Sequence, residues 1–151
     1  MTLKQTIQND FVSAMKAKDS VAKSALSGLK SKITEAEKAK SNTDLTDSEV
    51  IKVITAAIKQ RKQSYEEFVK GSRLDLAEKE QGEITVLERY MPKQMTEGEI
   101  AAEAATIMAE LGPIENKQRL IGQTIGMFNK KFTGRADGSV VKSVVESLAT
   151  I

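Results

Sequence analysis

The stretch TDSEVIKVITAAIKQRKQSYEEFVKG, residues 46–71, decides the fold class of this chain. Thr46 and Glu49 have the spacing of a capping box, in which each side chain accepts a hydrogen bond from the other residue's backbone N–H. Apolar residues then recur every three or four positions, at Val50, Ile51, Ile54, Ala57, Ile58, Tyr65 and Phe68. This pattern predicts a long amphipathic helix that ends at Gly71.

The same helical period continues on both sides of this stretch, and no segment shows the alternation typical of a strand. Before it, one apolar face runs from Leu3 to Met15 and a second from Val21 to Ile33. After it, Ser72 with Asp75 predicts the start of a fourth helix, which Pro92 stops.

Three further helices are expected after the proline, the first of which ends at Gly112-Pro113. Their expected N-terminal caps are Thr96 with Glu99, Asn116 and Asp137. We therefore expect an all-α protein with an N-terminal four-helix domain over residues 1–92 and a C-terminal three-helix bundle over residues 93–151.

The composition excludes several classes of chemistry. The chain has 151 residues, a net charge of +2 and neither cysteine nor histidine, so disulfides, thiolate nucleophiles and the usual zinc ligands are absent. We expect no metal, no cofactor and no catalytic residue. No apolar run reaches the roughly 18 residues that span a bilayer, and the N-terminus does not read as a signal peptide. We expect a cytoplasmic protein without a membrane partner.

A basic cluster lies between Asn116 and Lys142. Six basic residues and one acidic residue give this segment a net charge of +5, although the tail from Lys93 has seven of each. The basic residues are Lys117, Arg119, Lys130, Lys131, Arg135 and Lys142, and the acidic one is Asp137. Such segregation is what phosphate binding needs, and a plain solvated surface is the alternative. We expect the side chains of Lys130, Lys131 and Arg135 to lie on the surface.

Glycines accompany this cluster. Gly122 and Gly126 lie four positions apart in an expected helix, where each costs about 1 kcal/mol relative to alanine. They leave a smooth groove, which either a neighbouring helix or the backbone of a ligand such as RNA can approach closely. Gly134 and Gly138 are expected to supply loop conformations that other residues resist. Aromatic residues make up only 4% of the chain, so an RNA interface would use backbone and shape rather than base stacking.

Carboxylates crowd one expected helix, but the surrounding sequence LAEKEQGE, residues 76–83, is too polar to indicate a pocket. Acid–base catalysis needs burial or coupling that separates the pKa values of such groups. The carboxylates are Asp75, Glu78, Glu80 and Glu83. We expect no pocket around them and no catalysis by them.

Two sequence motifs resemble those of a known family. DLAEKEQGEITVLERYMPKQMTEGEI, residues 75–100, resembles the signature of the YqeY family. IGQTIGMF, residues 121–128, followed by GRADG, residues 134–138, resembles the tail that this family shares with the B subunit of the glutamine-dependent aspartyl/glutamyl-tRNA amidotransferase (GatB). The resemblance covers essentially the whole chain. It implies a two-part all-helical fold whose GatB/YqeY-type tail binds tRNA.

The residues that match the tail's glycine and basic-loop positions are Gly122, Gly126, Lys130, Lys131, Gly134, Arg135 and Asp137. The resemblance also associates the chain with carbon–nitrogen ligases that use glutamine as amido-N-donor. The kinase-like catalytic body of the amidotransferase has no counterpart in this sequence. The leading hypothesis is therefore a non-catalytic, tRNA-binding accessory module that acts with a tRNA-charging or amidation protein. The alternatives are a protein-interaction adaptor with an incidental basic loop and, third, an amide-transfer enzyme.

Overall fold

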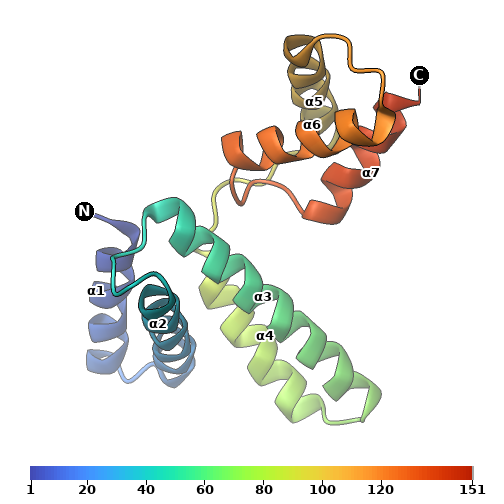
Figure 1. Cartoon of the computed structure of the whole chain (residues 1–151). Coiled ribbons are helices and arrows are strands. Elements are labelled where there is room, and N and C mark those ends of the chain that lie inside the picture. The colour runs from blue at the N-terminus through green and yellow to red at the C-terminus, as the bar shows by residue number, and fades with distance from the viewer. Residues whose placement is uncertain (151) are drawn as a thin grey trace. The chain divides into compact units, whose positions relative to one another are not determined.

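The chain is helical throughout the computed structural model, which describes residues 1–150 (Figure 1). Over this range there are seven α-helices and no strand, which confirms the all-α prediction. The helices are α1 (Leu3–Lys16), α2 (Ser20–Ala39), α3 (Asp47–Lys70), α4 (Leu74–Glu88), α5 (Glu97–Leu111), α6 (Lys117–Lys131) and α7 (Gly138–Ala149). Their contacts divide the chain into two compact units, Met1–Met91 and Pro92–Ile151, which are described separately. No helix in residues 1–150 is long and apolar enough to cross a membrane.

In the first unit, α3 and α4 form a long hairpin, and the pair α1 and α2 packs beside it (Figure 1). The apolar faces predicted for these helices meet in one core, in which Ile7, Leu26, Leu29, Ile54 and Leu87 are each at most 2% exposed. Burial of side chains of this size contributes roughly 1.5–3 kcal/mol each. The core therefore holds four amphipathic helices together without any single helix being apolar on all sides.

The predicted capping box at the start of α3 is confirmed. The backbone N–H of Glu49 donates to Thr46 Oγ1 at 3.2 Å, and the N–H of Thr46 donates to Glu49 Oε1 at 3.3 Å. A second box, which the sequence analysis missed, begins α1 with Thr2 and Gln5. These local contacts satisfy backbone donors that a helix N-terminus otherwise leaves free.

The predicted capping box at the start of α4 is wrong. Helix α4 begins after Arg73, whose side chain makes no capping hydrogen bond. Ser72 instead takes a left-handed conformation, with φ of 58°, and this lets the Arg73 N–H reach the Phe68 carbonyl at 2.8 Å. Gly71, at which α3 was expected to end, keeps φ at −83°. The serine is used to end α3 and is no longer free to begin α4.

A buried ion pair joins α2, α3 and α4. Glu83 is only 3% exposed, although it lies in a polar stretch of sequence. Its two carboxylate oxygens accept hydrogen bonds from Arg61 Nη1 at 2.8 Å and from the Ser24 hydroxyl at 2.7 Å. Glu80 shares the same guanidinium nitrogen at 3.3 Å. Because a buried charge without its partner is costly, these contacts are structural and fix how the three helices pack.

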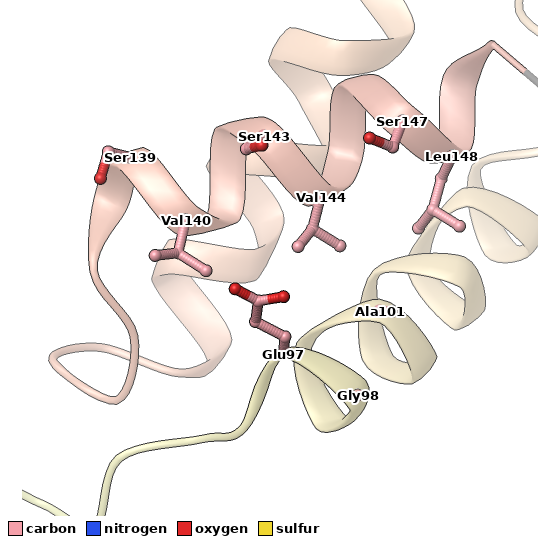
Figure 2. Close-up of a pocket in the computed structure, with 9 residues that line it drawn as sticks. All are labelled: Glu97, Gly98, Ala101, Ser139, Val140, Ser143, Val144, Ser147 and Leu148. Carbon is pink, nitrogen blue, oxygen red and sulfur yellow. The ribbon is translucent and has the colours of Figure 1, made fainter.

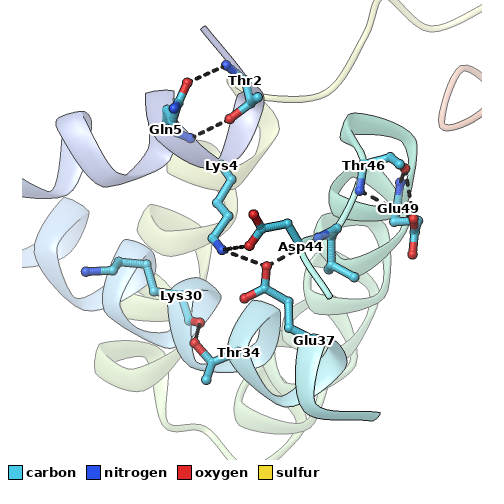
Figure 3. Close-up of polar contacts among 10 residues, drawn as sticks. Thr2, Lys4, Gln5, Lys30, Thr34, Glu37, Asp44, Thr46 and Glu49 are labelled. Atoms are coloured by element: carbon cyan, nitrogen blue, oxygen red, sulfur yellow. Dashed lines mark hydrogen bonds and ion pairs between the residues drawn. The ribbon is translucent and has the colours of Figure 1, made fainter. Parts of the chain in front are cut away.

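A second polar network ties the beginning of α1 to the end of α2 (Figure 3). Lys4 Nζ lies 2.6 Å from Glu37 and 3.0 Å from Asp44, and Glu37 also accepts the Leu45 N–H at 3.2 Å. The hydrogen bond to Glu37, followed by that to Asp44, raises the pKa of Lys4 above its usual value. The same lysine lowers the pKa of Asp44. This network holds the loop before α3 against α1.

The second unit is a three-helix arrangement of α5, α6 and α7 with its own core. Phe128, Val141 and Val145 are fully buried in it, and Ile107 is 1% exposed. The expected break after α5 is confirmed at Gly112, whose φ of 74° lies in the left-handed region that favours glycine. The helices therefore follow the predicted order, and α6 is positioned with one face on the core and the other outward.

Candidate functional site

The inner face of α6 explains its orientation. Asn116 caps the helix as predicted, its side chain accepting the Arg119 N–H at 3.0 Å. Ile121, Thr124 and Phe128 are buried at three- and four-residue spacing. The Thr124 hydroxyl donates to the Leu120 carbonyl at 2.7 Å, so even the polar member of this face is satisfied within the helix. The opposite face of α6 is left to the solvent.

That opposite face carries four of the predicted site residues. Arg119, Gly122, Gly126 and Lys130 are all exposed, and they follow one another at intervals of three, four and four positions. Residues at these intervals lie on one side of an α-helix. We call this set the outer stripe. With a rise of 1.5 Å per residue, its two cationic ends lie about 16 Å apart along the axis.

The two glycines of the outer stripe face open space. A side-chain carbon placed on Gly122 or on Gly126 would meet no atom within 4 Å outside its own helix turn. The expectation that a neighbouring helix packs closely there is therefore wrong. Glycine in a helix costs about 1 kcal/mol per residue, and no internal contact offsets that cost here. The exposed backbone is available to a molecule outside the chain.

The last turn of α6 and the loop that follows it hold the next predicted residues. Lys130 and Lys131 are exposed, and Lys131 Nζ lies 5.5 Å from the centre of the Phe132 ring. Gly134 has φ of 74°, a left-handed backbone conformation that favours glycine, as expected. Gly138 has no left-handed φ and begins α7. Neither lysine makes an ion pair within residues 1–150.

Arg135 is half-buried, contrary to its expected position on the surface. Its Nε donates to the Lys93 carbonyl at 3.1 Å, and its own carbonyl accepts the Met95 N–H at 2.8 Å. Gln94 Nε2 also donates to the Gly134 carbonyl at 2.7 Å. We call these contacts the clasp. The sequence analysis missed Lys93, Gln94 and Met95 because nothing in the connecting segment after the proline marks them as partners of the loop.

The clasp uses only part of the arginine. The guanidinium carbon lies 5.8 Å from the centre of the Phe132 ring, and Nη1 and Nη2 make no hydrogen bond within the described range. Arginine has five N–H donors, of which Nε supplies one. Arg135 is therefore held in place by the protein and retains N–H donors from which an anion can accept hydrogen bonds.

Two of the predicted basic residues lie apart from the outer stripe. Lys117 is exposed but precedes Gly122 by five positions, which places it about 140° around α6. Lys142 is exposed on α7, beside the buried Val141. The outer stripe and Lys131 thus lie together on α6, while Lys117 and Lys142 contribute positive charge from other directions.

Asp137 caps α7 as predicted. Its Oδ1 accepts the Ser139 N–H at 2.8 Å and the Ser139 hydroxyl at 2.5 Å. The only acidic residue of the basic segment is therefore engaged at a helix N-terminus, where a negative charge is favourable.

The second unit also has an acidic side that the sequence analysis did not single out. Residues 95–115 contain five acidic residues and no basic one, so this segment carries −5 beside the basic segment's +5. The acidic residues are Glu97, Glu99, Glu103, Glu110 and Glu115. All but the third are exposed. Within residues 1–150, no group of three or more carboxylates is placed to hold a metal ion.

Comparisons with known proteins place these features in a family. The sequence profile of YqeY, described as Yqey-like protein, matches residues 4–148. The chain is 31% identical over 144 residues to the "Altered inheritance of mitochondria protein 41, mitochondrial" of Pyrenophora tritici-repentis, which covers 94% of this chain and 78% of the relative.

Two proteins of the same name are similar over a shorter stretch. That of Lachancea thermotolerans is 35% identical over 107 residues, covering 70% of this chain and 57% of the relative. That of Kluyveromyces lactis is 37% identical over 108 residues, covering 70% of this chain and 58% of the relative. The matched stretch is less than two thirds of the length of these two relatives.

The expectation of a cytoplasmic location is wrong on this comparison. The relatives are named as mitochondrial proteins, which points to the mitochondrion rather than to the cytoplasm. The inference failed because the lack of cysteine and of a long apolar run reports on disulfides and on membrane insertion. Neither property distinguishes one reducing aqueous compartment from another.

Proposed function

The chain belongs to the YqeY-like family, and from this premise we propose that its second unit is a non-catalytic RNA-binding module whose ligand is tRNA. The observation that carries the proposal is the outer stripe of α6. Arg119 and Lys130 supply positive charge at its two ends, and the two glycines between them expose backbone with no atom of residues 1–150 outside the helix turn within 4 Å of where a side chain would begin. This is the arrangement that a sugar–phosphate backbone can approach closely.

The mode of binding follows from the side chains around the stripe. Phe128 is fully buried and Phe132 is half-buried against the core, so neither offers an exposed ring for base stacking. Lysine and arginine contacts to phosphates position a protein without reading sequence. The module therefore recognises RNA by backbone and shape, and Lys131 with the free donors of Arg135 extends the contact into the loop.

The proposed contacts bind their ligand and do not transform it. Lysine and arginine remain protonated at neutral pH, and they hold phosphates without moving protons. The role that fits is an accessory one, in which the module presents tRNA to a separate charging or amidation protein. An amide-transfer reaction by the chain itself would need turnover of glutamine by the isolated protein.

A titration of bulk tRNA into the full chain at about 50 mM and 200 mM salt tests the proposal. The test variant is Arg119→Ala/Lys130→Ala/Lys131→Ala, and the matched control is Lys16→Ala/Lys59→Ala/Lys62→Ala, three exposed lysines of the first unit that make no ion pair within residues 1–150. Each lost phosphate contact lowers the slope of log affinity against log salt by about 0.7–0.9. We expect a loss of about 2 units in the test variant and little change in the control.

An unchanged affinity and an unchanged salt slope in the test variant would refute RNA binding at the outer stripe. The protein-interaction adaptor would then be the leading function. One observation favours that second candidate independently, namely an apolar groove between α5 and α7.

A further inference from the structure

A groove of about 620 Å³ runs between α5 and α7, away from the outer stripe of α6 (Figure 2). Its α7 wall carries Val140, Val144 and Leu148, three half-buried apolar side chains at intervals of four residues. Its α5 wall carries Gly98 and Ala101, which have little or no side chain. One side of the groove is therefore an apolar ridge and the other is nearly flat.

The spacing of this ridge fits another helix. Side chains four residues apart form a ridge in which successive side chains lie about 6 Å apart along the helix axis. The ridges of one helix pack into the grooves of the next. Small residues on the α5 wall let the backbone of a docked helix approach closely. Ser139, Ser143 and Ser147 border the apolar ridge at the same interval and offer hydroxyls at its rim (Figure 2).

Charge decides what kind of helix fits. Among residues 1–150, Glu97 is the only charged residue that lines the groove, and Figure 2 shows its carboxylate directed toward Val140 and Val144. It makes no hydrogen bond or ion pair within residues 1–150. The surrounding segment, residues 95–115, has five acidic residues and no basic one. A negative field of this kind repels nucleic acid and attracts a cationic partner.

We propose that this groove binds a basic amphipathic helix of a partner protein. Apolar residues of that helix pack between Val140, Val144 and the α5 wall, and a lysine or arginine beside them meets Glu97. This goes beyond the proposed RNA contact, which uses the opposite charge on a different helix, and the two surfaces are tested separately. A module with both surfaces holds RNA on one side and a basic protein on the other.

The test uses three synthetic 15-residue helical peptides with the full-length chain labelled with ¹⁵N and no RNA present. The first peptide has a leucine face and a lysine face, the second replaces lysine by glutamate, and the third replaces leucine by alanine. We expect only the first to bind, with amide shifts concentrated at Gly98, Ala101 and Val144. Binding of the second or third peptide at these amides, shifts confined to other residues, or no binding of the first overturns the proposal.

Variants separate the groove from general attraction between charges. Glu97→Gln should weaken binding of the leucine–lysine peptide about two- to fivefold, as expected for one exposed ion pair, while Glu110→Gln makes the same change in net charge outside the groove and should not. Ser143→Arg, at an exposed position, should weaken it by about tenfold by adding bulk and like charge. Equal effects of the two glutamate variants, or no effect of Ser143→Arg, refute the groove as the binding site. Self-association of the unliganded chain that Ser143→Arg abolishes would assign the groove to a second copy and also refute it.

Discussion

Replacing Gly126 by alanine should make the second unit more stable and make it bind RNA less well. In a helix, alanine is favoured over glycine by about 0.5–1 kcal/mol, because glycine loses more backbone freedom on folding. Outside its own helix turn, no atom of residues 1–150 lies within 4 Å of the position that the added carbon would occupy, so no steric cost opposes this gain. Gly122→Ala has the same surroundings, and the two changes together should add about 1–2 kcal/mol.

The effect is large enough to measure. For a domain of about 60–100 residues, 1 kcal/mol shifts the melting temperature by roughly 4–8 °C. Thermal unfolding followed by circular dichroism should therefore place the double variant about 4–16 °C above the parent in the transition that belongs to the second unit. Gly98→Ala serves as a control for stability, because Gly98 is also helical and exposed but lies on α5.

Binding should change in the opposite direction. If a sugar–phosphate backbone lies against the outer stripe, two new methyl groups hold it away, and the affinity for tRNA should fall about three- to tenfold. The control Gly98→Ala should leave that affinity unchanged. A double variant that melts lower than the parent would refute the open surroundings of these glycines. A more stable variant that binds tRNA as well as the parent would refute the role of the stripe.

Four further outcomes follow from the same structure. Glu83→Gln should destabilise the first unit by about 2–4 kcal/mol in urea unfolding, because its arginine partner keeps a buried charge; an unchanged midpoint contradicts this. The fragment 93–151 should show a cooperative helical melt by itself, since its core is self-contained, and a non-cooperative signal would show otherwise. The hydrogen bond from Lys4 lowers the pKa of Asp44 in the folded state below its ordinary value of 3.8, so the ionised carboxylate stabilises the fold above pH 3.8 and this contribution is lost as the pH falls through the folded pKa. Asp44→Asn should therefore make the stability of the first unit less sensitive to acid. An unaltered pH profile of unfolding would count against this. Arg135→Lys removes the Nε donor and should speed hydrogen exchange at the Met95 amide, whereas equal exchange would mean that the clasp does not need it.

Local sequence signals predicted the helices well. A capping box or an asparagine cap involves residues three positions apart, so the printed order of residues contains the whole interaction, as at Thr46 and Asn116. The failure at Ser72 has the same origin. One serine had two local uses, to end α3 or to begin α4, and only the three-dimensional turn decides between them.

Features that depend on distant neighbours were not predictable. The spacing of Gly122 and Gly126 shows that they share a face but not whether that face meets another helix. Glu83 lies in a polar stretch, and its burial depends on Arg61 and on Ser24, which is 59 positions away. The clasp partners of Gly134 and Arg135 lie 40 or more positions earlier in the chain. In each case the outcome depends on how segments distant in sequence are placed in space, which local spacing does not state.

The division of charge in the second unit has a kinetic consequence. With −5 along residues 95–115 and +5 along residues 116–142, the unit is an electric dipole with almost no net charge. A unit with almost no net charge feels little net attraction to a polyanion. The electric field of the polyanion nevertheless rotates the unit, so that α6 approaches first and α5 faces away. This pre-orientation shortens the rotational search that limits most encounters to about 10⁵–10⁷ M⁻¹s⁻¹. It acts only within roughly one Debye length, about 8 Å at physiological salt, so the torque is felt in the last step of approach.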